Sequence, residues 1–444
     1  MSIGMKDKLF VLSMDAMVGE DLEYLMTRPN FSRLMNHCCK VEKVRTIYPS
    51  ITYPAHVSIL TGCRAATHGI FNNTTFRTTT GYPAWHLSSS EIKTEDLFAA
   101  AKRAGCTTAS VYWPVTGGNP NIDYLINEYF FYDPKETETS QCIFDLYAAQ
   151  GANAETLAVV EENMDRFPRK FRTKTDKLTL DQTFDNFING CVCSLIRNYQ
   201  PDVLIAHNCL LDSLRHRYGI FNEFVTEGLD ITDMWIGEII DSMEMANVFE
   251  STNFVIVSDH GQMNFARRIK PNVMLARGGF VKIAEDGTVE DYRAFAQSNG
   301  MSASIFVKEA KDEPFVYSYL QSLLADGVWG FEKIYTKDEV NQAYGWAGDF
   351  SFVLETDGIT TFSDDWHEPI LSPIDVSDYR LGKATHGYEP EKGPQPVFVA
   401  KGPAFKPDVV IPFCHIIDEG PTFARILGQH MHDAEGRVLS ELLN

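Results

Sequence analysis

Five short segments of the chain carry side chains that can bind divalent cations or act as a nucleophile. They supply three carboxylates, three imidazoles and one hydroxyl, from Asp15, Thr52, Asp212, His216, Asp259, His260 and His386. Such a set is sufficient to hold two divalent cations and one alcohol. An alcohol is a weak nucleophile near neutral pH, and a neighbouring cation lowers its pKa and orients it. The pattern predicts a hydrolase of charged esters, with phosphate esters as the favoured class.

Two of the segments have a spacing that suits metal binding. Asp212 and His216 are four residues apart, which places them on one face of a helical turn. Asp259 and His260 follow an apolar run and precede Gly261, which permits a tight turn. The alternatives are a surface Asp–His pair that caps a helix, and an ordinary exit from a strand.

Thr52 and Asn73 are the candidate catalytic residues. Pro54 is compatible with the first turn of a helix, so Thr52 is expected just before that helix, near its positive end. The alternative is a threonine that only caps the helix. The amide of Asn73 is a candidate donor to a phosphoryl oxygen, or else a simple turn residue.

The remaining histidines have no ligand-type partners at useful spacing and are expected to be structural. His386 itself lies in a polar loop, where a lone histidine is most often just solvated. The residues taken as structural are His37, His56, His68, His86, His207, His367, His415, His430 and His432.

Apolar, β-branched runs alternate with helical patterns along the chain. This alternation predicts an α/β fold of three α/β/α layers around a central, mostly parallel sheet. In such sheets ligands bind beyond the carboxyl ends of the strands, and three of the candidate segments follow predicted strands. The predicted strands are Leu9–Ser13, Thr107–Tyr112, Val203–Ala206, Phe254–Val257 and Val397–Ala400, and the predicted helices include Thr94–Ala104, Leu180–Asn198 and Ile231–Met245.

The long stretch between His260 and His386 has strand and helix signals of its own. We therefore expect a hydrolase core of residues 1–264 plus 378–444, interrupted by an inserted α+β subdomain of residues 265–377.

Composition narrows the functional classes. The 444 residues carry a formal net charge of −21, which argues against binding to nucleic-acid polymers or anionic membranes. Two bound cations would still make the site attractive to a small phosphoester. The nine cysteines form no paired zinc signature, and no long apolar segment occurs. These features predict a cytoplasmic protein, and they leave its oligomeric state open.

The order of these segments resembles the alkaline phosphatase superfamily, and specifically the type I phosphodiesterase/nucleotide pyrophosphatase family. That family's nucleophile segment looks like P-T-x-T-[FY]-P-N-H, followed by T-G, H-G-I and an asparagine. The chain reads Pro49 to His56, then Thr61-Gly62, His68-Gly69-Ile70 and Asn73. Further motifs of the family match Asp212 to Gly219, Ser258 to Gln262 and His386 to Tyr388.

The resemblance implies two divalent cations, with zinc as the expected ion and manganese as an alternative. One cation would take Asp212, His216 and His386, and the other Asp15, Thr52, Asp259 and His260. Thr52 would attack phosphorus and form a covalent phospho-threonine, which water then releases. Asn73 would stabilise the phosphoryl oxygens. The implied activity is cleavage of phosphodiester or pyrophosphate bonds in nucleotide-like substrates.

The chain departs from the family pattern at three positions that are not ligands. Ala55 stands where Asn is usual, Arg215 where Gly is common and Gln262 where Met is usual. These departures concern substrate fit, and the expected place of Arg215 and Arg217 is near the substrate or in solvent.

The sequence motifs are also compatible with other functions. The main alternative is a phosphonoacetate-hydrolase-like enzyme that cleaves a C–P bond, with Lys170, Lys174 or Lys177 as candidate carboxylate-binding residues. A phosphomutase and a metal-binding scaffold without turnover fit the motifs less well.

Overall fold

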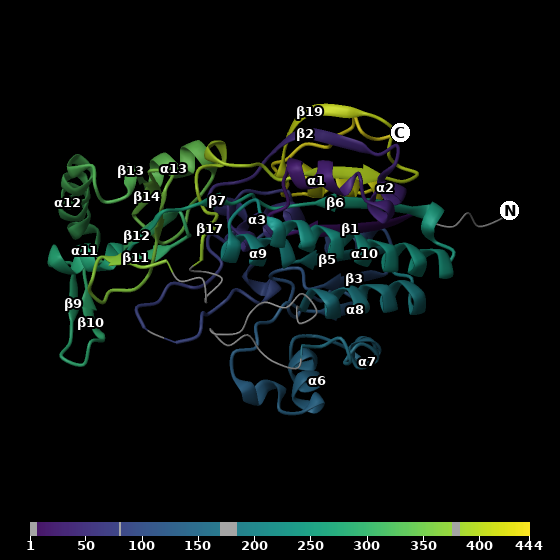
Figure 1. Ribbon diagram of the computed structural model, residues 1–444, viewed down its shortest axis with the longest axis horizontal. Helices are drawn as coiled ribbons and strands as arrows, with labels where there is room; N and C mark the ends of the chain where they lie inside the picture. Colours follow the sequence, from purple (N-terminus) through teal and green to yellow (C-terminus); the bar gives the residue numbers. More distant parts are fainter. Residues whose placement is uncertain (1–6, 80, 169–183, 375–381) are drawn as a thin grey trace.

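The computed structural model describes residues 7–79, 81–168, 184–374 and 382–444 and is built around an eight-stranded sheet (Figure 1). Each neighbouring pair in it is parallel except those that involve β18, which runs antiparallel to both of its neighbours. The predicted α/β class with a mostly parallel central sheet is thus confirmed. In spatial order the strands are β19 (Val410–His415), β2 (Cys39–Arg45), β18 (Phe398–Lys401), β6 (Thr252–Val257), β1 (Lys8–Met14), β5 (Val203–Asn208), β3 (Thr108–Val111) and β4 (Tyr124–Ile126).

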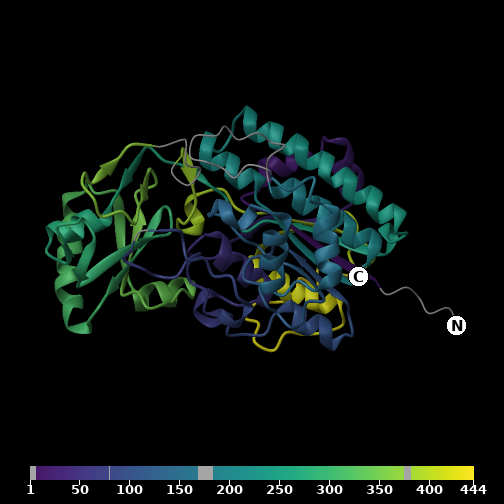
Figure 2. The ribbon, with the colours of Figure 1, turned by 90° about the horizontal axis from the view of Figure 1, so that it is seen from below.

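Helices cover both faces of this sheet, because its central strands are apolar on both sides. In β1, Phe10 and Leu12 belong to one core cluster, while Leu9 and Val11 belong to the other. Figure 2 shows the helices of residues 184–245 on one side and the C-terminal helix on the other. The first face carries α1 (Gly19–Leu25), α2 (Pro29–Met35), α6 (Ser140–Ala149), α7 (Ala154–Glu162), α8 (Phe184–Asn198), α9 (Leu210–Tyr218) and α10 (Glu223–Met245); the second carries α3 (Thr52–Thr61), α5 (Leu97–Arg103) and α14 (Glu419–Ile426).

The predicted helix at 180–198 is described only from Phe184 onward, because its first residues lie outside the described ranges. Among the residues described, no helix is both long and apolar enough to span a bilayer.

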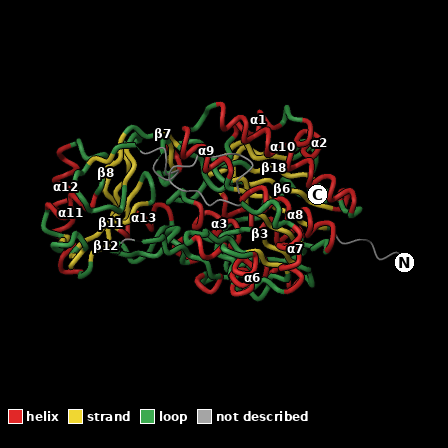
Figure 3. Tube along the Cα trace, turned by 60° about the horizontal axis from the view of Figure 1, so that its bottom comes forward, coloured by secondary structure: helices red, strands yellow, loops and turns green. Residues whose placement is uncertain are grey.

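Residues 267–372, which lie between β6 and β18 in the chain, form a second lobe, seen on the left in Figures 1 to 3. It has a core cluster of its own, which runs from Ile269 to Ile370. The bounds predicted for the inserted subdomain, 265–377, remain a prediction. The lobe contains β8 (Arg267–Ile269), α11 (Pro271–Arg277), β9 (Val281–Ile283), β10 (Val289–Tyr292), β11 (Ala294–Ser298), β12 (Ser302–Val307), α12 (Glu313–Asp326), β13 (Phe331–Thr336), α13 (Lys337–Tyr344), β14 (Phe352–Thr356), β15 (Thr360–Phe362) and β16 (Leu371–Ser372).

A four-stranded antiparallel sheet in the order β11-β12-β14-β13 forms the centre of this lobe. A short pair of strands, β7 (Met263–Asn264) and β17 (Ala384–Thr385), joins the two ends of the segment where it leaves and re-enters the larger lobe. This pairing brings His386 back to the segment that carries Asp259 and His260.

Candidate two-metal active site

Three of the predicted ligands meet at one edge of the central sheet because their strands are parallel neighbours. Met14, at the end of β1, pairs with Asn208 of β5, and Ser13 pairs with Val257 of β6. The chain segments that follow these strands therefore begin side by side. They carry Asp15, Asp212 and Asp259, as the sequence predicts.

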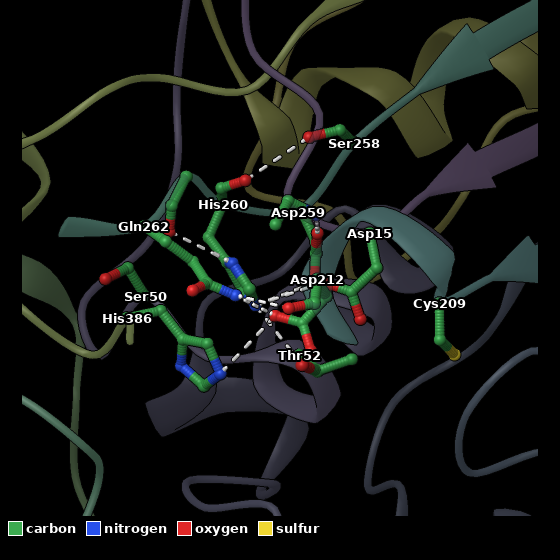
Figure 4. A network of polar contacts seen from close by, with 12 residues as sticks. Asp15, Ser50, Thr52, Cys209, Asp212, Ser258, Asp259, His260, Gln262 and His386 are labelled. Carbon is green, nitrogen blue, oxygen red and sulfur yellow. Dashed lines mark hydrogen bonds and ion pairs between the residues drawn. The ribbon is translucent and has the colours of Figure 1, made fainter. Parts of the chain in front are cut away.

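The Nε2 atom of His260 is the meeting point of one predicted ligand group (Figure 4). It lies 3.1 Å from Oδ2 of Asp259, 3.2 Å from Oγ1 of Thr52 and 3.5 Å from Oδ1 of Asp15. The four side chains expected to share one cation thus converge, and all four are buried.

The second predicted group is centred on Oδ1 of Asp212. This atom lies 3.3 Å from Nε2 of His216, one helical turn later on α9, and 3.9 Å from Nε2 of His386. The two groups adjoin each other, because ligand atoms of Asp15, Asp212 and His260 also lie within 4.8 Å of one another. His386 is buried here, so the solvated-loop alternative is wrong.

Thr52 is the first residue of α3, whereas the sequence predicts it just before the helix. The N-cap is Ile51, and Thr52 directs its hydroxyl to His260. The alternative of a plain capping threonine is therefore wrong. Asn73 is bound to the same helix end, because its Oδ1 atom accepts a hydrogen bond of 2.9 Å from the backbone N–H of Tyr53. This bond leaves the N–H groups of the amide to face other partners.

The side chains of the cluster are buried, and burial shifts their pKa values because it disfavours the charged forms. Burial, reinforced by the charges of Asp212 and Asp259, raises the pKa of Asp15 well above its usual range. Burial likewise raises the pKa of Asp259 to about 8 and lowers that of His386 to about 3. Burial alone would also raise the pKa of Asp212, but the neighbouring His216 outweighs it and the pKa is lowered.

These residues fit divalent cations. Oδ1 of Asp15 and Oδ2 of Asp259 are buried and have no hydrogen-bond partner among the described residues. Nδ1 of His216 lies 2.8 Å from the carbonyl oxygen of Ala384, which leaves Nε2 directed at Asp212. A carbonyl partner on one ring nitrogen is the arrangement that prepares the other for a metal. Cations would also supply the positive charge that the three carboxylates lack.

The inserted lobe supports the His386 loop. The backbone N–H of Met301 donates to the carbonyl oxygen of His386 at 2.9 Å. Gly387 has a φ of +91°, and a Cβ atom there would come within 1.6 Å of the carbonyl oxygen of Asn299. The side chain of Asn299 also accepts a hydrogen bond of 2.6 Å from Asn72, the neighbour of Asn73. One turn between β11 and β12 therefore holds both sides of the site.

Comparison with known proteins identifies the family. A sequence profile for "Type I phosphodiesterase / nucleotide pyrophosphatase" matches residues 9–389. The chain belongs to this family. The resemblance seen in its motifs is thereby confirmed.

Named relatives of the family are distant in sequence. Bis(5'-adenosyl)-triphosphatase enpp4 of Xenopus laevis is 22% identical over 445 residues, covering 95% of this chain and 78% of the relative. Venom phosphodiesterase 2 of Crotalus adamanteus is 20% identical over 419 residues, covering 89% of this chain and 42% of the relative. The chain spans 42% of the length of this Crotalus protein and 26% of the length of a venom phosphodiesterase from Naja atra.

A solved family structure has the same fold. Murine ectonucleotide pyrophosphatase/phosphodiesterase 5, as an inactive variant in complex with AMP, superimposes with a TM-score of 0.66 at 18% identity. The match covers 99% of this chain and 100% of that one.

The three departures from the family pattern are all buried. Ala55 lies on the face of α3 that packs into the core. Arg215 is 1% exposed and forms an ion pair with Asp21, so its expected place in solvent is wrong. Gln262 donates a hydrogen bond from Nε2 to the carboxylate of Asp212, so it orients a predicted ligand. Arg217 is also buried, so its expected place in solvent is wrong.

Two histidines taken as structural lie directly behind the family's ligands. Nδ1 of His56 is 3.5 Å from Oδ2 of Asp259, and Nε2 of His207 is 3.4 Å from Oδ2 of Asp15. For His207 the available signal was its position at the end of a strand that precedes Asp212. Lys170, Lys174 and Lys177 lie outside the described residues.

Proposed function

We propose that the chain is a two-metal phosphodiesterase or nucleotide pyrophosphatase that works through a covalent phospho-Thr52. The main observation behind this proposal is that Thr52, Asp15 and Asp259 converge on one nitrogen of His260, at distances of 3.1 to 3.5 Å. Distances of this size between ligand atoms are those of groups that share one cation. Membership of the family supports the same chemistry.

Each of the chain's own residues has a task in this proposal. Asp15, Asp259, His260 and Thr52 would hold one cation, and Asp212, His216 and His386 the other, with zinc favoured by the mixed N and O donors. When bound, the cations lower the pKa of the nucleophile and neutralise phosphoryl charge.

Oγ1 of Thr52 forms the new P–O bond as the bond to the leaving group breaks, and the hydroxyl proton passes to water. Asn73, fixed by Tyr53, donates from its amide to a phosphoryl oxygen. Water then cleaves the phospho-threonine and restores the hydroxyl.

A nucleotide-like small molecule is the proposed substrate class. The support is the AMP complex of the murine relative and the adenosyl substrate in the name of the Xenopus relative. Tyr53, the second residue of α3, and Trp113, which follows β3, are 1% exposed and pack in the core. A base would therefore have to stack on other residues.

Comparison of three substrates tests the proposal. We expect the nitrophenyl ester of a nucleotide to be cleaved faster than nitrophenyl phosphate, with no phosphate released from phosphonoacetate. Chelation should abolish turnover and zinc should restore it. Release of phosphate from phosphonoacetate alone would instead identify a C–P hydrolase, and turnover that survives chelation would contradict the two-metal assignment.

A further inference from the structure

A second cluster of ligand-type side chains lies behind Asp15, outside the two groups already described. It consists of Asp15 itself, His207 near the end of strand β5 and Cys209 just beyond that strand. One ligand atom from each lies within 4.8 Å of the others. Figure 4 includes Cys209 beside the main cluster.

Two of the three spacings among these atoms are close to those of a tetrahedral metal site. Nε2 of His207 lies 3.4 Å from Oδ2 of Asp15 and 3.2 Å from Sγ of Cys209. A tetrahedral zinc ion with bonds of about 2.0 Å to N and O and about 2.3 Å to S separates its ligand atoms by about 3.3 to 3.6 Å. A cation could therefore enter with small adjustments of side chains.

The two oxygens of Asp15 serve opposite sides. Oδ1 is 3.5 Å from Nε2 of His260 in the proposed catalytic group, while Oδ2 is 3.4 Å from His207. A carboxylate in this position can bridge two cations, one through each oxygen. The second cluster is thus an extension of the first rather than a competitor for Asp15.

Burial and charge also favour a cation here. His207 is 0% exposed, so its Nε2 atom faces Asp15 and Cys209 away from solvent. Burial, and then the charges of nearby acids that include Asp185 and Asp15, raise the pKa of the Cys209 thiol well above its usual range, so the thiol keeps its proton until a cation displaces it. A cation among these acids would lower the electrostatic cost of their burial.

We propose that Asp15, His207 and Cys209 form a third divalent-cation site with a thiolate ligand, suited to zinc or another borderline-soft ion. Binding forms bonds from the cation to Sγ, Nε2 and Oδ2, and the thiol proton leaves to water. The site would be structural, since it lies behind Asp15 and away from Thr52. It goes beyond the proposed function, because it predicts an additional metal and a sulfur ligand.

Cobalt substitution of the full chain tests this site without reference to turnover. Cobalt bound by a thiolate gives an intense near-ultraviolet charge-transfer band, which N and O ligands alone do not give. We expect that band in the unmodified protein and in Thr52→Ala, and its loss in Cys209→Ser. Zinc content should fall in Cys209→Ser from about three to about two per chain.

Two further variants make the outcome decisive. Cys38→Ser changes a half-buried thiol elsewhere and should retain the band. His207→Gln keeps the thiol and should weaken or shift the band. If the unmodified protein shows no band, or if Cys209→Ser keeps both the band and the zinc content, the site does not exist and the thiol only donates to His207. Loss of turnover in Thr52→Ala with the band intact would support both proposals separately.

Discussion

Nη2 of Arg215 lies 2.6 Å and 2.7 Å from the two carboxylate oxygens of Asp21, and both side chains are buried. Arg215 also donates to the carbonyl oxygen of Ala16, the residue after Asp15. Because Arg215 is located between Asp212 and His216 on α9, this pair fixes the helix that carries two predicted ligands against the loop that carries a third.

Replacing Arg215 by methionine should therefore be costly. The change leaves the buried Asp21 carboxylate without its charged partner, and loss of one member of a buried pair typically costs about 3–5 kcal/mol. Urea unfolding monitored by circular dichroism measures this loss. Arg28→Met is the matched control, because Arg28 and Asp230 pair at the surface with exposed fractions of 37% and 42%, where such pairs contribute about 0–1 kcal/mol. Equal losses in the two variants would mean that the buried pair has no special role.

Removal of the Thr52 hydroxyl should abolish turnover while metal binding persists. Thr52→Ala should lower kcat by at least about a hundredfold, since no other hydroxyl is expected to replace the nucleophile. Thr52→Ser keeps an oxygen and should retain part of the activity. Rapid quench with labelled substrate should show phosphoprotein for threonine and serine but not for alanine. Substantial kcat in Thr52→Ala would remove the nucleophile assignment.

The contact between the inserted lobe and the His386 loop can be tested at Gly387. Gly387→Ala would drive a methyl group into the carbonyl oxygen of Asn299. We expect the loop to shift and the metal content to fall. Gly279→Ala is the control, because Gly279 also has a positive φ, +78°, but nothing lies within 4 Å of the added carbon. It should cost about 1 kcal/mol of stability and leave the metal content unchanged. Elemental analysis that finds full occupancy in both variants would contradict the supporting role of the lobe.

Glu355 should make stability depend on pH. Burial raises its pKa from the ordinary 4.5 to about 7, although Lys392 pairs with it at 2.8 Å and Tyr48 donates to it at 2.6 Å. The folded chain therefore keeps this proton to a higher pH than the unfolded chain. The stabilising contribution is complete below about pH 4.5 and is lost as pH rises to about 7, by up to about 3 kcal/mol.

Glu355→Gln should flatten that part of the profile. The difference in unfolding free energy between the variant and the unmodified protein should change across pH 4.5 to 7 and be constant above it. Glu332→Gln provides the control, because Glu332 pairs with the same lysine but is 54% exposed. A profile that keeps its slope in Glu355→Gln would assign the dependence to another group.

Sequence reasoning could find the ligands because their positions follow from local rules. Asp15 and Asp259 follow apolar strands, and Asp212 and His216 have helical spacing, so each is visible in a short window. The central sheet follows from the same strands. The place of Thr52 was missed by one residue because helix boundaries depend on backbone geometry that sequence does not specify closely.

The partners that hold the ligands could not be predicted in this way. Asp21 and Arg215 look like surface charges, and only the packing of α9 against α1 buries them together. Gln262 appeared as a departure from the family pattern, and its contact with Asp212 depends on a turn that no local rule fixes. The support of His386 by Met301 joins two lobes whose relative placement is a property of the whole fold.

The strand pair β7–β17 and the contacts between the β11–β12 turn and the His386 loop also set an order of events during synthesis. Asp15 is synthesised before the second lobe, and His386 only after that entire lobe has been made. A nascent chain that ends before that lobe would gather three acidic side chains at the sheet edge with no imidazole from the far loop to accompany them. Loading of both proposed cations would thus wait for long-range contacts, which form slowly.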